Sequence, residues 1–329
     1  VIDLPNIRLE DFYPINDREF LIIDRRDLII YDIVSKEIKK KVLYYDFGFS
    51  KNPTETLEIW DKEKVLADVI WAIRKFQPDV IVNRFDHRSP ATTHGHHTAS
   101  AMLSVESFEL ANNPTIFPEQ LQFVKPWQTK RQFFNTSWWF YGSVEKFNAA
   151  DKTNLIALQT GVYYAGLGKS NQEIAALSRS CHQSQGFGST GVRGEETDYL
   201  EFINGVALKE KKSLFEGIDT SWNRVRGGKP LGDLLTTIAA EFDHNNPSAS
   251  IPNLAKAYSM MKALDENHWA PLKSEAIKEI IASCSGLYLE AVAQNQEATP
   301  GSTIKLKLEA INRSSAPIQL LSVTTLPEQ

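Results

Sequence analysis

Only two cysteines, Cys181 and Cys284, occur among the 329 residues of this chain. Two thiols are too few to form a disulfide framework or a zinc site built from thiolates, and they do not decide the compartment. Basic residues are not in excess either, because 36 lysines and arginines stand against 41 acidic residues and leave a formal net charge of −5. The lack of a basic stripe argues against a nucleic-acid-binding role.

Long apolar runs and the signature of a serine hydrolase are also lacking. No apolar run approaches the roughly 20 residues of a membrane-spanning helix. No Gly-x-Ser-x-Gly elbow and no clear Ser/His/Asp order is present, which disfavours hydrolases of that type. Hydrophobic residues nevertheless make up 42% of the chain and aromatic residues 10%, enough for the well-packed cores of two or three domains.

Histidines gather in one short stretch. Four of the seven in the chain fall within residues 86–100, namely His87, His94, His96 and His97. Histidine is the commonest metal ligand and the usual acid or base near neutral pH, so this density indicates chemistry. A β-branched run at 79–85 predicts a buried strand, and residues 98–111 have helical spacing. The histidines therefore lie on a strand-to-helix connection, which in an α/β sheet sits where ligands bind.

The spacing of these histidines narrows the chemistry. If the helix begins near Gly95, His94 lies just before its first turn and His97 lies within that turn, so the two imidazoles can converge on one point. The positive end of the helix dipole favours an anionic or strongly polarised ligand there. A catalytic zinc site needs three protein ligands and a water, and Asp86 is a local candidate for a catalytic role beside the histidines. The alternative is a histidine-rich surface loop that merely reflects composition.

Several stretches together resemble the PIG-L/LmbE-like family of zinc-dependent N-acetylglucosaminyl deacetylases, most of all its large multidomain bacterial members. They are residues 46–60, the strand at 77–82, the Thr93-His94-Gly95-His96-His97 loop and residues 181–189. The resemblance runs from about Asp46 to the C-terminus. It implies a Rossmann-like α/β core that holds Zn²⁺ and removes an acetyl group from an N-acetylated amino sugar or glycoconjugate.

The resemblance also implies roles for individual residues. His97 would be the metal ligand and His94 the catalytic histidine, whereas His96 stands where smaller relatives commonly have Asp, so its role stays open. We group His96 with Arg84 as a candidate for substrate binding. For the compartment, resemblance to large bacterial members slightly favours an exported or periplasmic protein, while the sequence alone leaves it unknown.

The second half of the family's active site has no counterpart in this sequence. That half is an Ala-His-Pro-Asp-Asp-Glu motif after the first strand, which supplies two more zinc ligands and a carboxylate base, and the motif occurs nowhere in these residues. We therefore expect weak metal binding and little deacetylase activity from the chain as given. The alternative is a non-catalytic carbohydrate-binding or scaffold protein that keeps the deacetylase framework.

A second candidate region follows a predicted helix at 171–180. Residues 182–191 are rich in glycine, hydroxyls and amides, a composition that lets a backbone approach a polyhydroxylated ligand closely. His182 and Arg193 are its best polar candidates for substrate binding, and a flexible linker is the alternative. The aromatic run at 138–141 also has two interpretations, because such runs either stack on sugar rings or pack in a core.

Composition predicts four segments along the chain. Residues 1–45 read as a β segment that resembles a propeller blade, with apolar runs at 19–24 and 27–32. Residues 46–195 form an incomplete LmbE-like deacetylase core, which contains an amphipathic helix at 63–76. Residues 196–286 look mainly helical. Residues 287–329 alternate like strands and resemble the start of a β-sandwich module, with a last strand at 318–323, and we expect the natural protein to continue beyond them.

Overall fold

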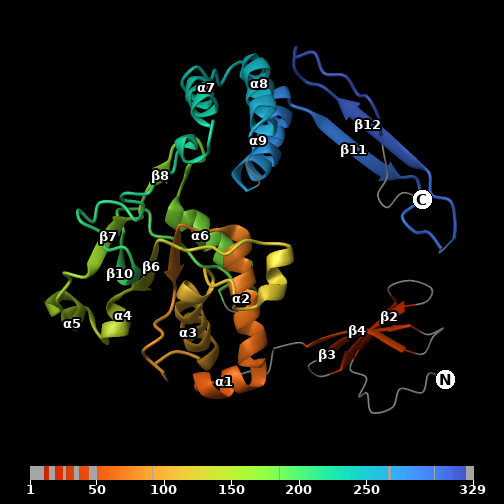
Figure 1. Cartoon of the computed structure of the whole chain (residues 1–329). Coiled ribbons are helices and arrows are strands. Elements are labelled where there is room, and N and C mark those ends of the chain that lie inside the picture. The colour runs from red at the N-terminus through yellow and green to blue at the C-terminus, as the bar shows by residue number, and fades with distance from the viewer. Residues whose placement is uncertain are drawn as a thin grey trace. The chain divides into compact units, whose positions relative to one another are not determined.

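The computed structural model describes residues 50–90, 92–184, 186–265, 268–299 and 301–323 with their side chains, and the backbone of four strands within residues 11–43. The chain divides into two compact units, Val1–Ile218 and Asp219–Gln329 (Figure 1). Helices and a mixed sheet make up the larger unit, which agrees with the predicted α/β class. Within the part that is described, no helix combines the length and the apolar character needed to cross a membrane.

The N-terminal strands form a sheet of their own. It contains β1 (Asp11–Pro14), β2 (Glu19–Asp24), β3 (Asp27–Asp32) and β4 (Glu37–Leu43), joined in sequence order as an antiparallel meander. The two apolar runs predicted as strands are β2 and β3. The resemblance of this segment to a propeller blade remains a prediction. The side chains of this sheet lie outside the described residues.

The second sheet carries the histidine region. Its order is β5 (Val80–Asn83), β6 (Arg131–Thr136), β10 (Thr197–Gly205) and β7 (Leu155–Gln159). β5 and β6 are parallel, whereas β10 is antiparallel to both β6 and β7. The mainly helical region expected from residue 196 therefore starts later, since residues 197–205 are a central strand. Tyr199, Leu200, Phe202 and Ile203 favour a strand there, and the sheet supplies partners on both sides.

Helices cover one face of this sheet. They are α1 (Pro53–Trp60), α2 (Lys62–Phe76) and α3 (Gly95–Leu110) (Figure 1). Their shared core contains Leu66, Ile70, Leu103 and, from β5, Ile81. The predicted amphipathic helix is α2, and the side chain of Asn52 caps α1 by accepting a hydrogen bond from the Thr54 N–H at 2.9 Å. The opposite face of the sheet packs Phe133, Ile156 and Leu200 together.

Short elements complete the first unit. They are η1 (Pro118–Gln122), α4 (Trp138–Tyr141), α5 (Val144–Ala149), β8 (Tyr163–Tyr164), β9 (Lys169–Ser170) and α6 (Asn171–Ser180). α6 occupies the predicted range. A capping box, in which Ser170 and Glu173 bond each other's backbone N–H groups, fixes its start.

The second unit is a helical group followed by a hairpin. It contains η2 (Trp222–Arg224), α7 (Lys229–Ala240), η3 (Pro247–Ser250), α8 (Ile251–Lys262), α9 (Trp269–Ser285), β11 (Tyr288–Ala293) and β12 (Leu306–Ile311). The helices α7, α8 and α9 agree with the helical composition predicted before residue 286, and β11 and β12 agree with the alternating pattern predicted after it. The strand predicted at 318–323 is wrong, because these residues adopt no strand and pair with neither edge of the hairpin.

Candidate functional site

The candidate site is the connection between β5 and α3, residues 84–94, which we call the histidine loop. The loop leaves the sheet beside β6, where Nη1 of Arg84 donates to the backbone carbonyl of Asn135 at 3.2 Å. It ends at His94, the extended residue that precedes the first turn of α3. Because β5 and β6 are parallel, the loop lies at the carboxyl end of both strands, as the sequence predicts.

Gly95 fixes where α3 begins. Its N–H donates to the carbonyl oxygen of Ser50 at 2.7 Å. A Cβ atom at this position would lie 2.6 Å from the carbonyl oxygen of Asn52 and 2.6 Å from Oγ1 of Thr56. The first turn of α3 therefore packs closely against the start of α1, and position 95, the first of α3, has no space for a side chain.

The structure brings the two principal histidines together. The rings of His94 and His97 are nearly parallel, with centroids 5.2 Å apart and an interplanar angle of 9°. Phe85 stacks on His97 with a centroid distance of 3.9 Å and an angle of 7°. His96 points elsewhere, since its ring meets Trp60 of α1 edge-on at 5.5 Å. Phe85, which sequence analysis did not single out, thus holds one face of the predicted metal ligand.

The surroundings of His97 favour its neutral form. Burial lowers the pKa of this imidazole, and the positive charges that His94 and His96 carry when protonated lower it further. A neutral imidazole has a lone pair on one ring nitrogen and is the form that binds a metal ion. The position is therefore suited to a ligand near neutral pH.

Asp86 is engaged within the loop. Its Oδ1 accepts hydrogen bonds from the backbone N–H and the Nε of Arg88 at 3.0 and 2.8 Å, and its Oδ2 accepts from Oγ of Ser89 at 2.8 Å. Although burial acts to raise its pKa, the hydrogen bonds from Arg88 and Ser89 outweigh burial and the pKa is lowered. Asp86 is thus a carboxylate that shapes the loop, and a catalytic role for it remains a prediction.

Arg88, Glu201 and Tyr141, to which sequence analysis gave no role, complete this cluster together with His87. Arg88 donates to both carboxylate oxygens of Glu201 in β10, and these hydrogen bonds to the carboxylate raise the pKa of the guanidinium. Burial, and next the charge of Glu201, raise the pKa of Tyr141 at the end of α4. His87 lies 3.7 Å from Asp86, and its pKa is lowered, chiefly by burial. Arg88 lies within the histidine-rich stretch of the sequence. Nothing in the neighbouring residues, however, predicts that it contacts Glu201.

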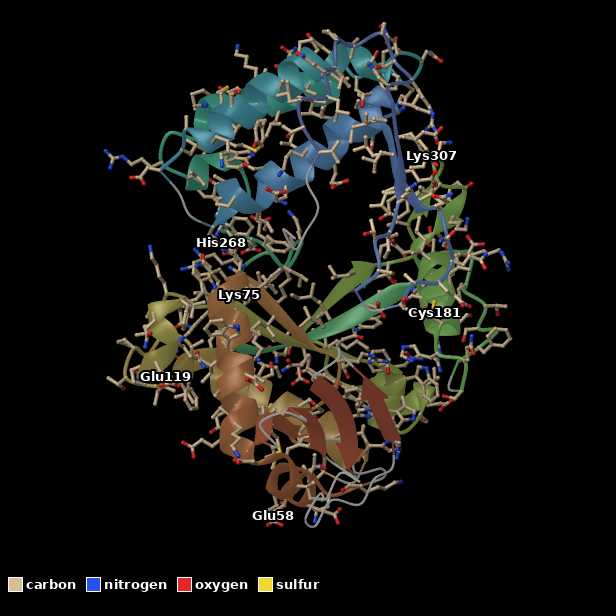
Figure 2. All side chains as sticks on the ribbon, turned by 90° about the vertical axis from the view of Figure 1, so that its right-hand side faces the viewer. Glu58, Lys75, Glu119, Cys181, His268 and Lys307 are labelled. Atoms are coloured by element: carbon tan, nitrogen blue, oxygen red, sulfur yellow. The ribbon has the colours of Figure 1, made fainter. Side chains whose placement is uncertain are left out.

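The other two predicted substrate residues belong to the region around α6. His182 is exposed directly after this helix, and Nε of Arg193 forms an ion pair with Oε1 of Glu173 at 3.1 Å. Cys181, an exposed free thiol, stands at the same end of the helix (Figure 2). Arg193 is thus paired with α6, and its role in substrate binding remains a prediction.

The donors that the structure brings together are fewer than a catalytic zinc site needs. Among the residues described with side chains, no group of three or more His, Cys, Asp or Glu is arranged to hold a metal ion. His94 and His97 supply two imidazoles, whereas a catalytic zinc site uses three protein ligands. Asp24, Asp27 and Asp32 of the N-terminal sheet are carboxylates of a kind that can bind a metal ion, but their side chains lie outside the described residues.

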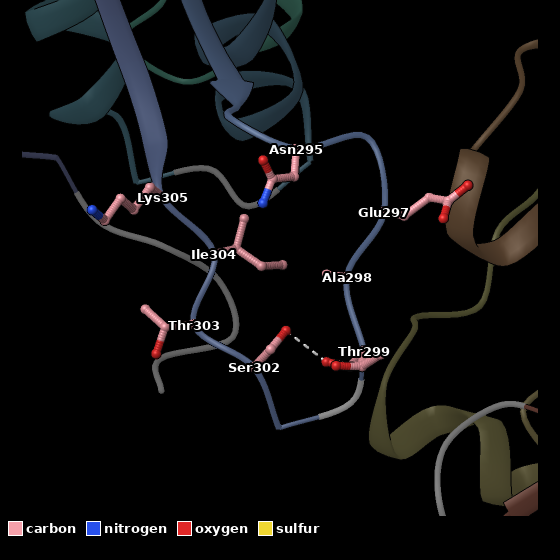
Figure 3. A pocket seen from close by; sticks show the side chains of 8 residues that line it. All are labelled: Asn295, Glu297, Ala298, Thr299, Ser302, Thr303, Ile304 and Lys305. Carbon is pink, nitrogen blue, oxygen red and sulfur yellow. Dashed lines mark hydrogen bonds between the residues drawn. The ribbon is translucent and has the colours of Figure 1, made fainter.

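Other concave features lack this chemistry. A pocket of about 460 Å³ in the second unit is lined by the turn between β11 and β12, where Oγ of Ser302 donates to the carbonyl oxygen of Thr299 at 2.7 Å (Figure 3). Its lining includes Glu297 and Lys305 but no histidine or cysteine. A pocket between α1 and α2 is lined by Thr54, Leu57 and four charged residues. Neither contains a predicted site residue.

Comparison of the chain with protein-family models, with curated proteins and with solved structures finds no match. The histidine loop and the start of α3 are therefore the features that indicate a function for this protein.

Proposed function

We propose that this protein is a zinc-dependent hydrolase that removes an acetyl group from an N-acetylated amino sugar or glycoconjugate, built on a Rossmann-like deacetylase core. The observation that carries the proposal is the pair of imidazoles, His94 and His97, with centroids 5.2 Å apart at the N-terminus of α3. The parallel pair β5 and β6, covered by α2 and α3, supports such a core.

In this proposal the two histidines have different tasks. His97, whose pKa is lowered mainly by burial, would hold the metal ion as a neutral ligand. His94, which precedes the first turn of α3, would donate to the oxyanion of the tetrahedral intermediate. Such a hydrogen bond typically stabilises the transition state by a few kcal/mol. When bound, Zn²⁺ would polarise the acetyl carbonyl and lower the pKa of a bound water towards about 7.

Exposed aromatic rings beside the loop support a sugar as the substrate. Of the aromatic run at the carboxyl end of β6, Phe140 is packed edge-on against Phe134 at 4.7 Å, whereas Trp138 and Trp139 remain 50% and 49% exposed. Trp139 contacts Phe140 at 4.9 Å, so its ring is held in place from one side. Exposed tryptophans with a fixed orientation are suited to stack on the apolar face of a pyranose ring.

A non-catalytic carbohydrate-binding protein is the second candidate function. The observation that favours it is the donor set of the described residues, two imidazoles where catalysis by zinc needs three protein ligands. In that case the exposed tryptophans would retain a sugar and the histidines would bind no ion tightly.

One experiment separates the two candidates. The chain is titrated with Co²⁺, a spectroscopic substitute for Zn²⁺, and release of acetate from N-acetylglucosamine oligosaccharides is measured with either ion present. Because half of the family's metal site has no counterpart in this sequence, the enzyme predicts a weak Co²⁺ absorption band that disappears in His97→Ala but persists in His244→Ala, a control in the second unit, together with slow acetate release. Sugar binding without a metal-dependent band or acetate would favour the second candidate and reject the first.

A further inference from the structure

The histidine loop is fastened to the central strand of its sheet by a charged pair. Nη1 and Nη2 of Arg88 donate to the two carboxylate oxygens of Glu201 at 2.9 and 2.7 Å. We propose that Arg88 and Glu201 form a positioning pair, which fixes the histidine loop on β10 and thereby sets the placement of His97 and His94. The proposal rests on the proposed function only in taking these histidines as the reactive groups.

Glu201 provides a fixed point of attachment. It lies opposite Phe134 of β6 and opposite Leu155 of β7, so β10 is paired on both sides at this residue. Its side chain is 19% exposed, which limits the positions that the carboxylate can reach. A guanidinium that binds a carboxylate through two parallel hydrogen bonds fixes direction as well as distance. The pair therefore defines the orientation of the loop relative to the sheet.

A continuous series of contacts leads from this pair to the histidines. Arg88 also donates from Nε and from its backbone N–H to Oδ1 of Asp86. The next residue towards β5 is Phe85, whose ring stacks on His97 at 3.9 Å, and His97 in turn stands 5.2 Å from His94. A displacement of Arg88 would therefore move Asp86 and, with it, the ring that supports His97.

Arg88 is a positioning residue because each of its three side-chain nitrogens, Nε, Nη1 and Nη2, already bonds a carboxylate of the protein. This holds although the side chain is 47% exposed. The groups that face it are Asp86, Glu201, His87 and Tyr141. Without the guanidinium, the carboxylates of Asp86 and Glu201 would lose the cation that they share, and their mutual repulsion would open the loop.

The test follows the histidine rings directly. In the full chain, the ring protons of His97 should show an upfield NMR shift caused by the stacked ring of Phe85, with the signal assigned from its absence in His97→Ala. We expect Glu201→Gln and Arg88→Lys to reduce this shift, and to speed amide hydrogen exchange in residues 87–94 by about tenfold or more. The exchanged pair, Arg88→Glu with Glu201→Arg, should recover part of both.

Glu106→Gln is the matched control, because it breaks an exposed ion pair of α3 with Lys62 at 2.8 Å and should leave both readouts unchanged. An unchanged His97 shift and unchanged loop exchange in Glu201→Gln and Arg88→Lys would overturn the proposal. If one variant does not fold, as judged by exchange in α2, the other decides. Failure of the wild type to bind Co²⁺ would count against the proposed function alone, because the shift and the exchange require no metal.

Discussion

The guanidinium of Arg74 donates to the side-chain carbonyl oxygen of Gln120 at 3.0 Å in the interior of the first unit. Arg74 is fully buried, and its remaining hydrogen bonds go to backbone carbonyl oxygens, those of Ala111, Asn113, Ile116 and Phe117. Gln120 in turn donates to the carbonyl oxygen of Ala67 in α2. One arginine thus satisfies the carbonyl groups of the turn that follows α3 and fixes this turn to α2.

Replacement of Arg74 by Ala should therefore destabilise the first unit strongly. The change removes a buried donor from five acceptors, of which the carbonyl oxygens of Ala111, Asn113 and Phe117 keep one backbone hydrogen bond each, and we expect a loss of roughly 3 kcal/mol or more. Urea unfolding measures the effect. Lys75→Ala, the exposed neighbour on the same helix (Figure 2), is the control and should change stability by less than about 0.5 kcal/mol. Equal effects of the two variants would contradict this account of Arg74.

Gly95→Ala should move the start of α3. The new Cβ would lie 2.6 Å from the carbonyl oxygen of Asn52, so α1 and α3 must separate, at a cost of about 1–3 kcal/mol. We expect lower stability and a weaker Phe85–His97 stack, measured by urea unfolding and by the His97 proton shift. Gly166→Ala is the control because nothing lies within 4 Å of its added Cβ. A Gly95→Ala variant as stable as this control would show that the helices do not meet here.

Replacement of His97 and replacement of His94 by alanine should impair different properties of the protein. His97→Ala removes a bond to the metal and should abolish Zn²⁺ binding, whereas His94→Ala should leave binding largely intact and lower turnover. Isothermal titration gives the metal affinity, and acetate release gives the turnover. Equal metal affinity in the wild type and in His97→Ala would refute the ligand assignment.

Asp86 should stabilise the loop in a pH-dependent way. Because its folded-state pKa lies below the unfolded value, the unfolded state binds more protons between the two values, and stability rises with pH there. The stability advantage of wild type over Asp86→Asn should be full above about pH 4–5 and disappear as pH falls through the folded-state pKa. Urea unfolding at several pH values measures it. A stability difference between wild type and Asp86→Asn that stays constant from pH 3 to 7 would contradict this prediction. The control is Glu63→Gln, which removes an exposed carboxylate of α2, and the same pH dependence in that variant would also contradict it.

Trp139→Ala should weaken sugar binding without unfolding the protein. Loss of one stacking ring is expected to cost about 1 kcal/mol, or roughly fivefold in affinity for N-acetylglucosamine oligosaccharides. Titration calorimetry measures this affinity, and Trp138→Ala shows whether both rings take part. Trp222→Ala, in the second unit, is the control. Unchanged affinity in both α4 variants would remove the aromatic support for a sugar substrate.

Local sequence determined much of this protein. The periodicity of residues 63–76 predicts α2, and the helical pattern of residues 171–180 predicts α6. The clustered histidines identify the β5–α3 connection as the candidate site, since residues three apart at a helix start share one side. Such features depend on neighbours in the chain, which a sequence displays directly.

Tertiary structure decided the rest. Arg88 meets Glu201, 113 positions away, only because β10 lies between β6 and β7. The aromatic run divides into the packed Phe140 and the exposed Trp138 and Trp139 only when α4 lies against the sheet. Composition and spacing cannot supply these contacts, because each depends on which distant strands pair and which face of the sheet a helix covers. The sequence thus placed the histidines at the β5–α3 connection, and the pairing of the sheet decided what holds that connection in position.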